Sequence, residues 1–314
     1  MAVPLRRRSL LTAGLLAVLT ACGSNGSPAG RGADGRPAPT PADPDQTARQ
    51  RIGSAMTSLI AAYDSTSAHA VLRRQLAEEL AALHGGRPTA SPSASSSPTT
   101  SSSVLSPATT RTVVSDATLA AREQELGALC ATELLATSPA LARLTASVAA
   151  GAAQRAALLG AKPVAAGSSG GDRIRPSAAE VSALQAALGA EHATVYGYGV
   201  LGALLSDARR TQATSDYQLH RARRDALEAE LTTSGIRPAA AAAAYELPFA
   251  VTDAGSARRL AALLEERLAA VYANAVQAGE NELRDQAATQ LRLAALRALS
   301  WRGTSTPFPG LPER

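Results

Sequence analysis

The chain has 314 residues, a formal net charge of +5 and only 3% aromatic residues. Three arginines and no acidic residues lie within residues 1–21, so the remaining chain carries 5 − 3 = +2, which gives no reason to expect nucleic-acid binding. The scarcity of aromatic residues and the abundance of Ala, Leu, Arg and Glu exclude a strand-rich fold and predict an all-α protein.

The first 22 residues have the features of an export signal that ends in a lipidation site. Arginines at positions 6–8 precede a mostly apolar run, residues 10–21, which is too short to span a bilayer and is typical of a signal peptide. The run ends in "LTAC", which resembles the lipobox of bacterial lipoproteins and would make Cys22 the acylated N-terminus. Plain cleavage after Ala21 is the alternative, and the arginine cluster suits either the general or the twin-arginine export route.

Acylation of Cys22 would determine where the protein resides. Two or three acyl chains hold a protein stably at a membrane, whereas one chain binds only marginally. Cys130 is the only other cysteine, so acylation of Cys22 leaves no internal disulfide. We therefore expect lipid anchoring on the extracytoplasmic side of the cell membrane, with an envelope protein or a small ligand as a further partner.

Three stretches interrupt the helical pattern and divide the mature chain. Residues 22–43, rich in Gly, Pro and Ala, predict a flexible tether. Residues 85–111 consist mainly of Ser, Thr, Pro and Ala, bury too little apolar surface to fold, and predict a disordered insertion. Residues 161–175 predict a linker between two helical regions.

The N-terminal helical region, residues 44–160, contains four predicted helices. Short breaks close two hairpins, and the Ser/Pro-rich insertion joins the hairpins. This plan indicates a second, degenerate helical bundle; one larger helical array with an insertion is the alternative. The predicted helices are 44–62, 67–84, 116–136 and 139–160.

The C-terminal region, residues 176–310, has the clearest helical pattern. Ser177 and Glu180 form a capping box at the start of the first helix, and Gly235 and Gly279 mark the ends of the second and third. The predicted helices are 177–205, 206–234, 253–278 and 281–301.

The long connection between the second and third of these helices determines the topology. Two helices of about 26 residues span roughly 39 Å. About 17 residues connect them, enough to run the length of a bundle at roughly 3.3 Å each. Two hairpins joined by one long crossover make the arrangement of a ferritin-like four-helix bundle.

Helical spacing directs three ionisable residues of this region toward the bundle interior: Glu191, His220 and Glu265. A carboxylate in a helical core is unfavourable unless a cation, a metal or hydrogen bonds compensate it. Our preferred hypothesis is a structural polar network in which His220 and Arg224 satisfy Glu191, with tyrosine hydroxyls, Tyr217 among them, completing it.

Two alternatives assign these residues a ligand. In one, Glu191 and His220 bind iron or manganese together with Glu265 or Asp216; in the other, the bundle holds a small molecule. Ferritin-like di-iron sites require a Glu-x-x-His motif on each of two helices. Here Tyr217 occupies the glutamate position before His220, and the fourth helix has no histidine, so we expect no cofactor and no enzymatic activity.

Five blocks carry a resemblance to a known family: "ALQAALGAEHATVYGYGVLGALL", "HRARRDALEAEL", "AAAYELPFAV", "LAALLEERLAAVY" and "RALSWRGTSTPFPG". Across residues 177–310 the chain resembles an uncharacterised ferritin-like domain of actinobacterial proteins, many of them predicted lipoproteins. The resemblance implies a four-helix ferritin-like fold and no established activity. Together with the lipobox it predicts a non-catalytic binding or scaffold protein of the cell envelope; the alternative is a metal-binding or oxidative protein.

Overall fold

A computed structural model describes residues 43–66, 68–85, 114–162 and 175–314. These residues form eight helices and no strand, which confirms the all-α prediction for the described part. The predicted signal peptide (1–21) and Cys22 lie outside the described residues, as do most of the predicted tether (22–43), insertion (85–111) and linker (161–175). No helix among the described residues is long and apolar enough to cross a membrane.

The helices begin and end close to the predicted positions. The largest differences are at the start of the second helix and the ends of the third and fifth, each shifted by three residues. The bounds are α1 (Pro44–Tyr63), α2 (Ala70–Leu83), α3 (Asp116–Glu133), α4 (Pro139–Leu158), α5 (Ala178–Gly202), α6 (Asp207–Thr233), α7 (Ala254–Ala278) and α8 (Asn281–Arg302).

Local sequence signals account for the best-predicted helix ends. The Ser177 side chain accepts a hydrogen bond from the Glu180 backbone N–H, and the Glu180 carboxylate accepts one from the Ser177 N–H, so the predicted capping box forms at α5. Gly235 follows α6 with a φ of +75°, a conformation that costs glycine no Cβ clash. These local signals determine where α5 begins and where α6 ends, independently of tertiary packing.

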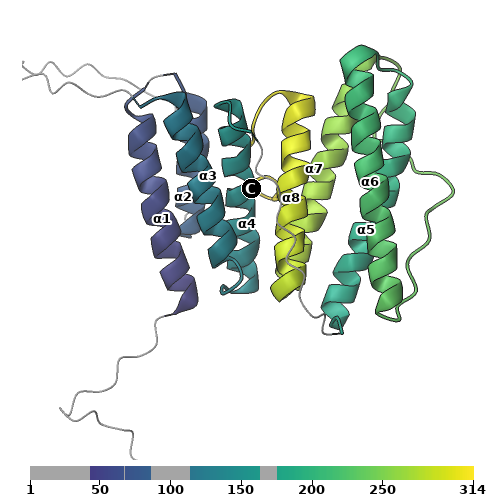
Figure 1. Cartoon of the computed structure of the whole chain (residues 1–314), viewed down its shortest axis with the longest axis horizontal. Helices are drawn as coiled ribbons and strands as arrows, with labels where there is room; N and C mark the ends of the chain where they lie inside the picture. Colours follow the sequence, from purple (N-terminus) through teal and green to yellow (C-terminus); the bar gives the residue numbers. More distant parts are fainter. Residues whose placement is uncertain (1–42, 67, 86–113, 163–174) are drawn as a thin grey trace, which may run out of the picture. The chain divides into compact units, whose positions relative to one another are not determined.

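In the C-terminal region α5 packs against α6 and α7, and α7 packs against α8. The connection from α6 to α7 runs along α5, as Figure 1 shows. Its first residues, 237 and 239, hydrogen-bond to Gln185 near the start of α5, and the ring of Tyr245 lies 5.5 Å from that of Tyr196. Its last residues, including Phe249, pack against a hydrophobic cluster that contains Leu201 and Leu205 near the end of α5. The connection therefore crosses the length of the helices.

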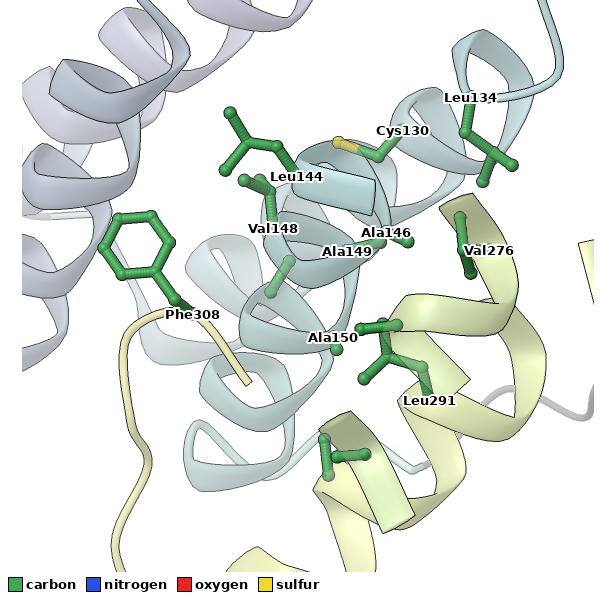
Figure 2. Packing of buried hydrophobic residues seen from close by; sticks show 14 of the residues in the cluster. Cys130, Leu134, Leu144, Ala146, Val148, Ala149, Ala150, Val276, Leu291 and Phe308 are labelled. Atoms are coloured by element: carbon green, nitrogen blue, oxygen red, sulfur yellow. The ribbon is translucent and has the colours of Figure 1, made fainter. Parts of the chain in front are cut away.

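Helix α4 lies at the centre of the hydrophobic core. It contacts α3 and α2 on one side and α7 and α8 on the other, and most of its residues are buried. Many of those residues are alanine or glycine, which allows neighbouring helices to approach closely. Figure 2 shows α4 between Phe308 on one side and Val276 and Leu291 on the other. One continuous core thus joins the N-terminal and C-terminal helices.

The C-terminal segment, residues 303–314, returns to the N-terminal helices. Ser305 exchanges hydrogen bonds with Gln75 of α2. The Ser147 hydroxyl of α4 donates to the carbonyl of Pro309 at 2.8 Å. Phe308 is buried in the same core, so this segment fixes the C-terminus to helices formed much earlier in the chain.

Candidate functional site

The structure brings together the three acidic and imidazole side chains that helical spacing directed inward. Glu191 (α5), His220 (α6) and Glu265 (α7) are 1%, 1% and 0% exposed. The Nδ1 of His220 lies 2.8 Å from Glu191 Oε2, and its Nε2 lies 2.9 Å from Glu265 Oε1. Because an ionised carboxylate only accepts hydrogen bonds, both ring nitrogens must donate, and His220 is an imidazolium.

Other donors occupy the remaining carboxylate oxygens. The Tyr272 hydroxyl donates to Glu191 Oε1 at 2.5 Å, and the Tyr198 hydroxyl donates to Glu265 Oε1 at 2.6 Å. Arg297 of α8 donates from Nε to Glu265 Oε2 at 2.9 Å. All four oxygens of the two glutamates therefore accept hydrogen bonds from protein groups, and all four helices contribute to the His220 network, defined as these six residues.

A third acid, Asp216 of α6, borders this network. Its Oδ2 accepts a hydrogen bond from Trp301 Nε1 at 3.0 Å and lies 3.5 Å from the Tyr198 hydroxyl. Burial, with Glu265 nearby, raises the pKa of Asp216 above its ordinary value. Burial also tends to raise the pKa of Glu265, but Arg297 and His220 outweigh it, so that pKa is lowered. The protein's own cations thus hold Glu265 ionised.

The charge on His220 makes stability depend on pH. Burial alone would lower the pKa of His220, but the hydrogen bonds to Glu191 and Glu265 raise it from 6.5 to about 9. A raised pKa stabilises the folded state fully below pH 6.5, and this contribution is lost as pH rises to 9. We expect the free energy of unfolding to fall by about 3 kcal/mol over that range because of this group.

Denaturant unfolding at pH 6 and pH 9.5, compared between the unmodified chain and His220→Gln, measures this contribution. The difference in stability between the two proteins should shrink at the higher pH. A constant difference would show that His220 does not hold its proton as the geometry requires.

Two residues predicted for the network lie elsewhere. Arg224 pairs with Asp225, its Nη2 lying 2.6 Å from Oδ1, and Tyr217 packs at the edge of a hydrophobic cluster with Arg221 over its ring. The predictions for Arg224 and Tyr217 were wrong because, at these two positions, the residue one place earlier in the sequence faces the interior of the bundle. The buried face of α6 contains Ala213, Asp216, His220 and Leu227. Arg223 lies three residues after His220 and donates a hydrogen bond from Nε to the Tyr272 hydroxyl at 3.3 Å.

The residues of the His220 network do not fit a metal ion as they stand. An imidazolium has no lone pair to offer, and each glutamate oxygen already accepts a hydrogen bond. Among the described residues, no group of three or more His, Cys, Asp or Glu side chains has the arrangement of a metal site. The arrangement as it stands neutralises buried charge rather than presenting vacant ligands.

The N-terminal helices contain a second buried network, which the sequence analysis did not predict. Arg155 of α4 is fully buried and donates from Nη1 to Glu79 of α2 at 2.9 Å and from Nε to Glu123 of α3 at 2.8 Å. The Tyr63 hydroxyl of α1 donates to the same Glu123 oxygen at 2.8 Å. Burial raises the pKa of Glu79 to about 7, although Arg155 opposes the rise. We call these four residues the Arg155 network.

The two networks share a triad of residue types on corresponding helices. In each set of four helices the first supplies a tyrosine, the third a glutamate and the fourth an arginine whose Nε binds that glutamate. Arg155 lies sixteen residues after the start of α4 at Pro139, and Arg297 lies sixteen residues after the start of α8 at Asn281. The triads are Tyr63, Glu123 and Arg155 in one set, and Tyr198, Glu265 and Arg297 in the other.

Gly151 of α4 allows the close approach of Glu79. A Cβ atom at position 151 would lie 2.4 Å from Glu79 Oε1 and 3.2 Å from Arg155 Nη1. We expect Gly151→Ala to destabilise the protein by about 1–3 kcal/mol because the buried ion pair must move. Gly189→Ala in α5 is the matched control, since nothing lies within 4 Å of its Cβ, and it should stabilise by about 0.5–1 kcal/mol. Denaturant unfolding compares the two; equal effects would contradict the packing at Gly151.

Comparison with known proteins identifies the C-terminal region as a domain. Residues 183–313, which include the His220 network, match the family described as "Domain of unknown function (DUF4439)". No curated protein matches the chain.

Among solved structures, the chain is similar to a conserved hypothetical protein from Mycobacterium tuberculosis. The two are 35% identical, and the match covers 41% of this chain and 98% of that protein, with a TM-score of 0.40.

Proposed function

We propose that this protein is a membrane-anchored, extracytoplasmic lipoprotein whose ferritin-like C-terminal domain serves as a non-catalytic binding or scaffold element of the cell envelope. The observation that carries the proposal is the neutralisation of Glu191 and Glu265 by His220 and Arg297, with every glutamate oxygen accepting a hydrogen bond from the protein. A satisfied buried network of this kind specifies how four helices pack.

Two further observations support the ferritin-like arrangement and its repetition. Residues 237–251 follow α5 from one end to the other, as a crossover between two hairpins requires. The tyrosine, glutamate and arginine shared by the two networks support a second, degenerate bundle formed by residues 44–160.

Elemental analysis tests the non-catalytic role of the domain. Protein purified from iron- and manganese-supplemented medium should contain no stoichiometric metal. The alternative function, a metal-binding or oxidative protein, requires His220 to lose its proton and Glu191 to leave Tyr272. Stoichiometric metal that disappears in Glu191→Ala would establish that alternative and overturn the scaffold proposal.

Lipid attachment is tested separately at Cys22. Cells fed a labelled fatty acid should incorporate the label into the protein and retain it in the membrane fraction, whereas Cys22→Ser should remove both. The matched control is Cys130→Ser, because Cys130 is fully buried in α3 and should not affect labelling. Labelling that survives Cys22→Ser would exclude this anchor and leave the role of the His220 network unaffected.

A further inference from the structure

The C-terminal segment, residues 303–314, covers the acid Glu79 of the Arg155 network. Gln75 of α2 exchanges two hydrogen bonds with Ser305 of the segment, at 3.1 and 2.8 Å. Gln75 lies one helical turn before Glu79, so both side chains are on the same face of α2. The backbone N–H of Phe308 interacts with the Glu79 carboxylate, and the Glu79 side chain is 0% exposed. The segment therefore helps to keep water away from this carboxylate.

Helix α4 holds the segment on both sides of the same acid. Ser147 and Gln154 bind the two ends of residues 306–309. The Ser147 hydroxyl donates to the carbonyl of the last of these residues at 2.8 Å, and Gln154 Oε1 accepts from the N–H of the first at 3.0 Å. Between them on α4 lies Gly151, where a Cβ atom would be 2.4 Å from Glu79 Oε1. Residues 306–309 therefore cross α4 beside the buried ion pair of Glu79.

The charges beneath the segment are not balanced. Glu79 and Glu123 share the guanidinium of Arg155, so the cluster carries one excess negative charge when both acids are ionised and is neutral when Glu79 is protonated. Each of the three side chains also has a buried atom without a hydrogen-bond partner among the described residues: Glu79 Oε2, Glu123 Oε2 and Arg155 Nη2. Water that reached the cluster would stabilise the ionised acids and supply these partners. Ionisation of Glu79 therefore opposes the binding of a segment that excludes water.

Phe308 is bound in a strained backbone conformation. Its φ is +53°, in the left-handed region that a residue with a bulky side chain rarely adopts, although Phe308 is buried in the core. Strain of this kind persists only while the surrounding contacts impose it, so it is relieved when the segment leaves. The strain at Phe308 and the excess charge below it both favour release of the segment.

We propose that the C-terminal segment is a pH-sensitive strap, which stays on α2 and α4 while Glu79 is protonated and lifts from them when Glu79 is ionised. Burial is the largest cause that raises the pKa of Glu79 to about 7, so the closed form binds this proton more tightly than a lifted form in which water reaches the acid. Lifting therefore becomes more favourable as pH rises toward 7. It exposes Phe308 and Leu311, which are buried in the closed form. The inference depends on neither the lipid anchor nor the His220 network.

Other groups face Glu79 from three helices. Arg155 of α4 stays charged, while burial raises the pKa of Cys130 on α3 and of Tyr63 on α1, so both of these stay neutral between pH 6 and pH 8. The negative charge of Glu123 adds to the effect of burial on Glu79, and the Phe308 N–H opposes it. The change in charge near pH 7 is therefore assigned to Glu79.

Hydrogen exchange measured by mass spectrometry on the purified protein tests the proposal. After correction for the intrinsic pH dependence of exchange, the protection of the amides in residues 304–311 should fall about five- to tenfold from pH 6 to pH 8. This range applies if the pKa of Glu79 in the lifted form lies between its ordinary value of 4.5 and about 6. The amides of α4 should remain at least about tenfold better protected at pH 8, because the segment lifts without unfolding of that helix. Constant protection of the segment, or equal protection of the segment and α4, would overturn the proposal.

Two variants assign the pH dependence to one acid. Glu79→Gln keeps the size of the side chain but cannot ionise, so residues 304–311 should be equally protected at pH 6 and pH 8. The matched control is Glu133→Gln on α3, because Glu133 is also buried but pairs with Arg51 of α1, and it should retain the fall in protection. A fall that persists in Glu79→Gln would contradict the proposal.

A wider pH range decides the question if Glu79→Gln does not fold. In the unmodified chain the protection of the segment should fall up to about pH 7 and then level off, because Glu79 is ionised in both forms above that pH. A fall that continues to pH 9 would assign the effect to His220, whose pKa is about 9, and would overturn the role of Glu79.

Discussion

Replacement of His220 by leucine should lower the free energy of unfolding by about 3–5 kcal/mol, the usual consequence of removing one partner of a buried ion pair. Leucine fills much of the volume of the imidazole but donates no hydrogen bond. Glu191 Oε2 would lose its donor, and Glu265 would retain Tyr198 and Arg297. Most of the lost stability should therefore come from the unpaired Glu191. Denaturant unfolding at pH 6 measures the change in the free energy of unfolding.

A second histidine on the neighbouring helix provides the control. His192 is also mostly buried, but its Nε2 faces only the Ala239 carbonyl at 3.3 Å and the half-exposed Glu228 at 3.6 Å. His192→Leu should cost about 1 kcal/mol, the value of one ordinary hydrogen bond. The double variant Glu191→Gln/His220→Gln should recover part of the stability lost in His220→Leu, because it leaves no uncompensated charge at Glu191. Similar losses for His220→Leu and His192→Leu would contradict the role of the His220 network.

Replacement of Arg155 by methionine should be equally damaging in the N-terminal helices and should depend on pH. Methionine retains much of the side-chain volume but leaves Glu79 and Glu123 facing each other in a core without a cation. We expect a loss of about 3–5 kcal/mol at pH 8, above the pKa of Glu79 in the unmodified chain. The pKa of Glu79 is about 7 with Arg155 in place and is higher without this cation, so protonation of Glu79 at pH 5 should reduce the loss.

Arg143→Met is the matched control for Arg155→Met. Arg143 also lies on α4 and also pairs with a glutamate, Glu313, but this pair is partly exposed: the two side chains are 20% and 50% exposed, against 0% for Arg155, Glu79 and Glu123. Surface pairs contribute about 0–1 kcal/mol, so the control should change stability little at either pH. Thermal or denaturant unfolding of Arg155→Met and Arg143→Met, each compared with the unmodified chain at pH 5 and at pH 8, measures these effects. A loss in Arg155→Met that is independent of pH would show that Glu79 is already neutral or is not near this arginine.

The helices were predictable because their ends carry local signals. The capping box of Ser177 and Glu180 and the positive φ of Gly235 depend on residues within one helical turn, and both occur in the structure. The start of α2 was placed three residues too early because His69, its N-cap residue, forms no side-chain cap hydrogen bond. Ends fixed by packing alone have no such signal.

The candidate site was predictable only in part, since helical spacing gives a direction with an uncertainty of about one residue. It directed Glu191, His220 and Glu265 inward, and all three are buried. On α6 it selected Tyr217 and Arg224, whereas Asp216 is buried and Arg223 reaches Tyr272. Residues i and i+1 differ by about 100° around a helix, enough to move a side chain from the core to its edge.

The arginines were missed because no acid or histidine beside them in the sequence marked them. Arg297 lies three residues after Ala294 and four before Trp301, both buried, so the spacing that placed Glu191 also directs Arg297 inward. Arg155 follows Gly151 by four residues in the same way. Their partners lie on other helices, 32 residues or more away in sequence, and only the tertiary fold reveals the pairs.

The return of the C-terminal segment to α2 and α4 has a consequence for biosynthesis. Its hydrogen bonds join residues 152 to 230 positions apart, so the helices translated first acquire their final contacts from residues translated last. Contacts of such long sequence separation slow folding. The native contacts of α2 and α4 are therefore complete only after residues 303–314 have been translated and have packed back on these helices.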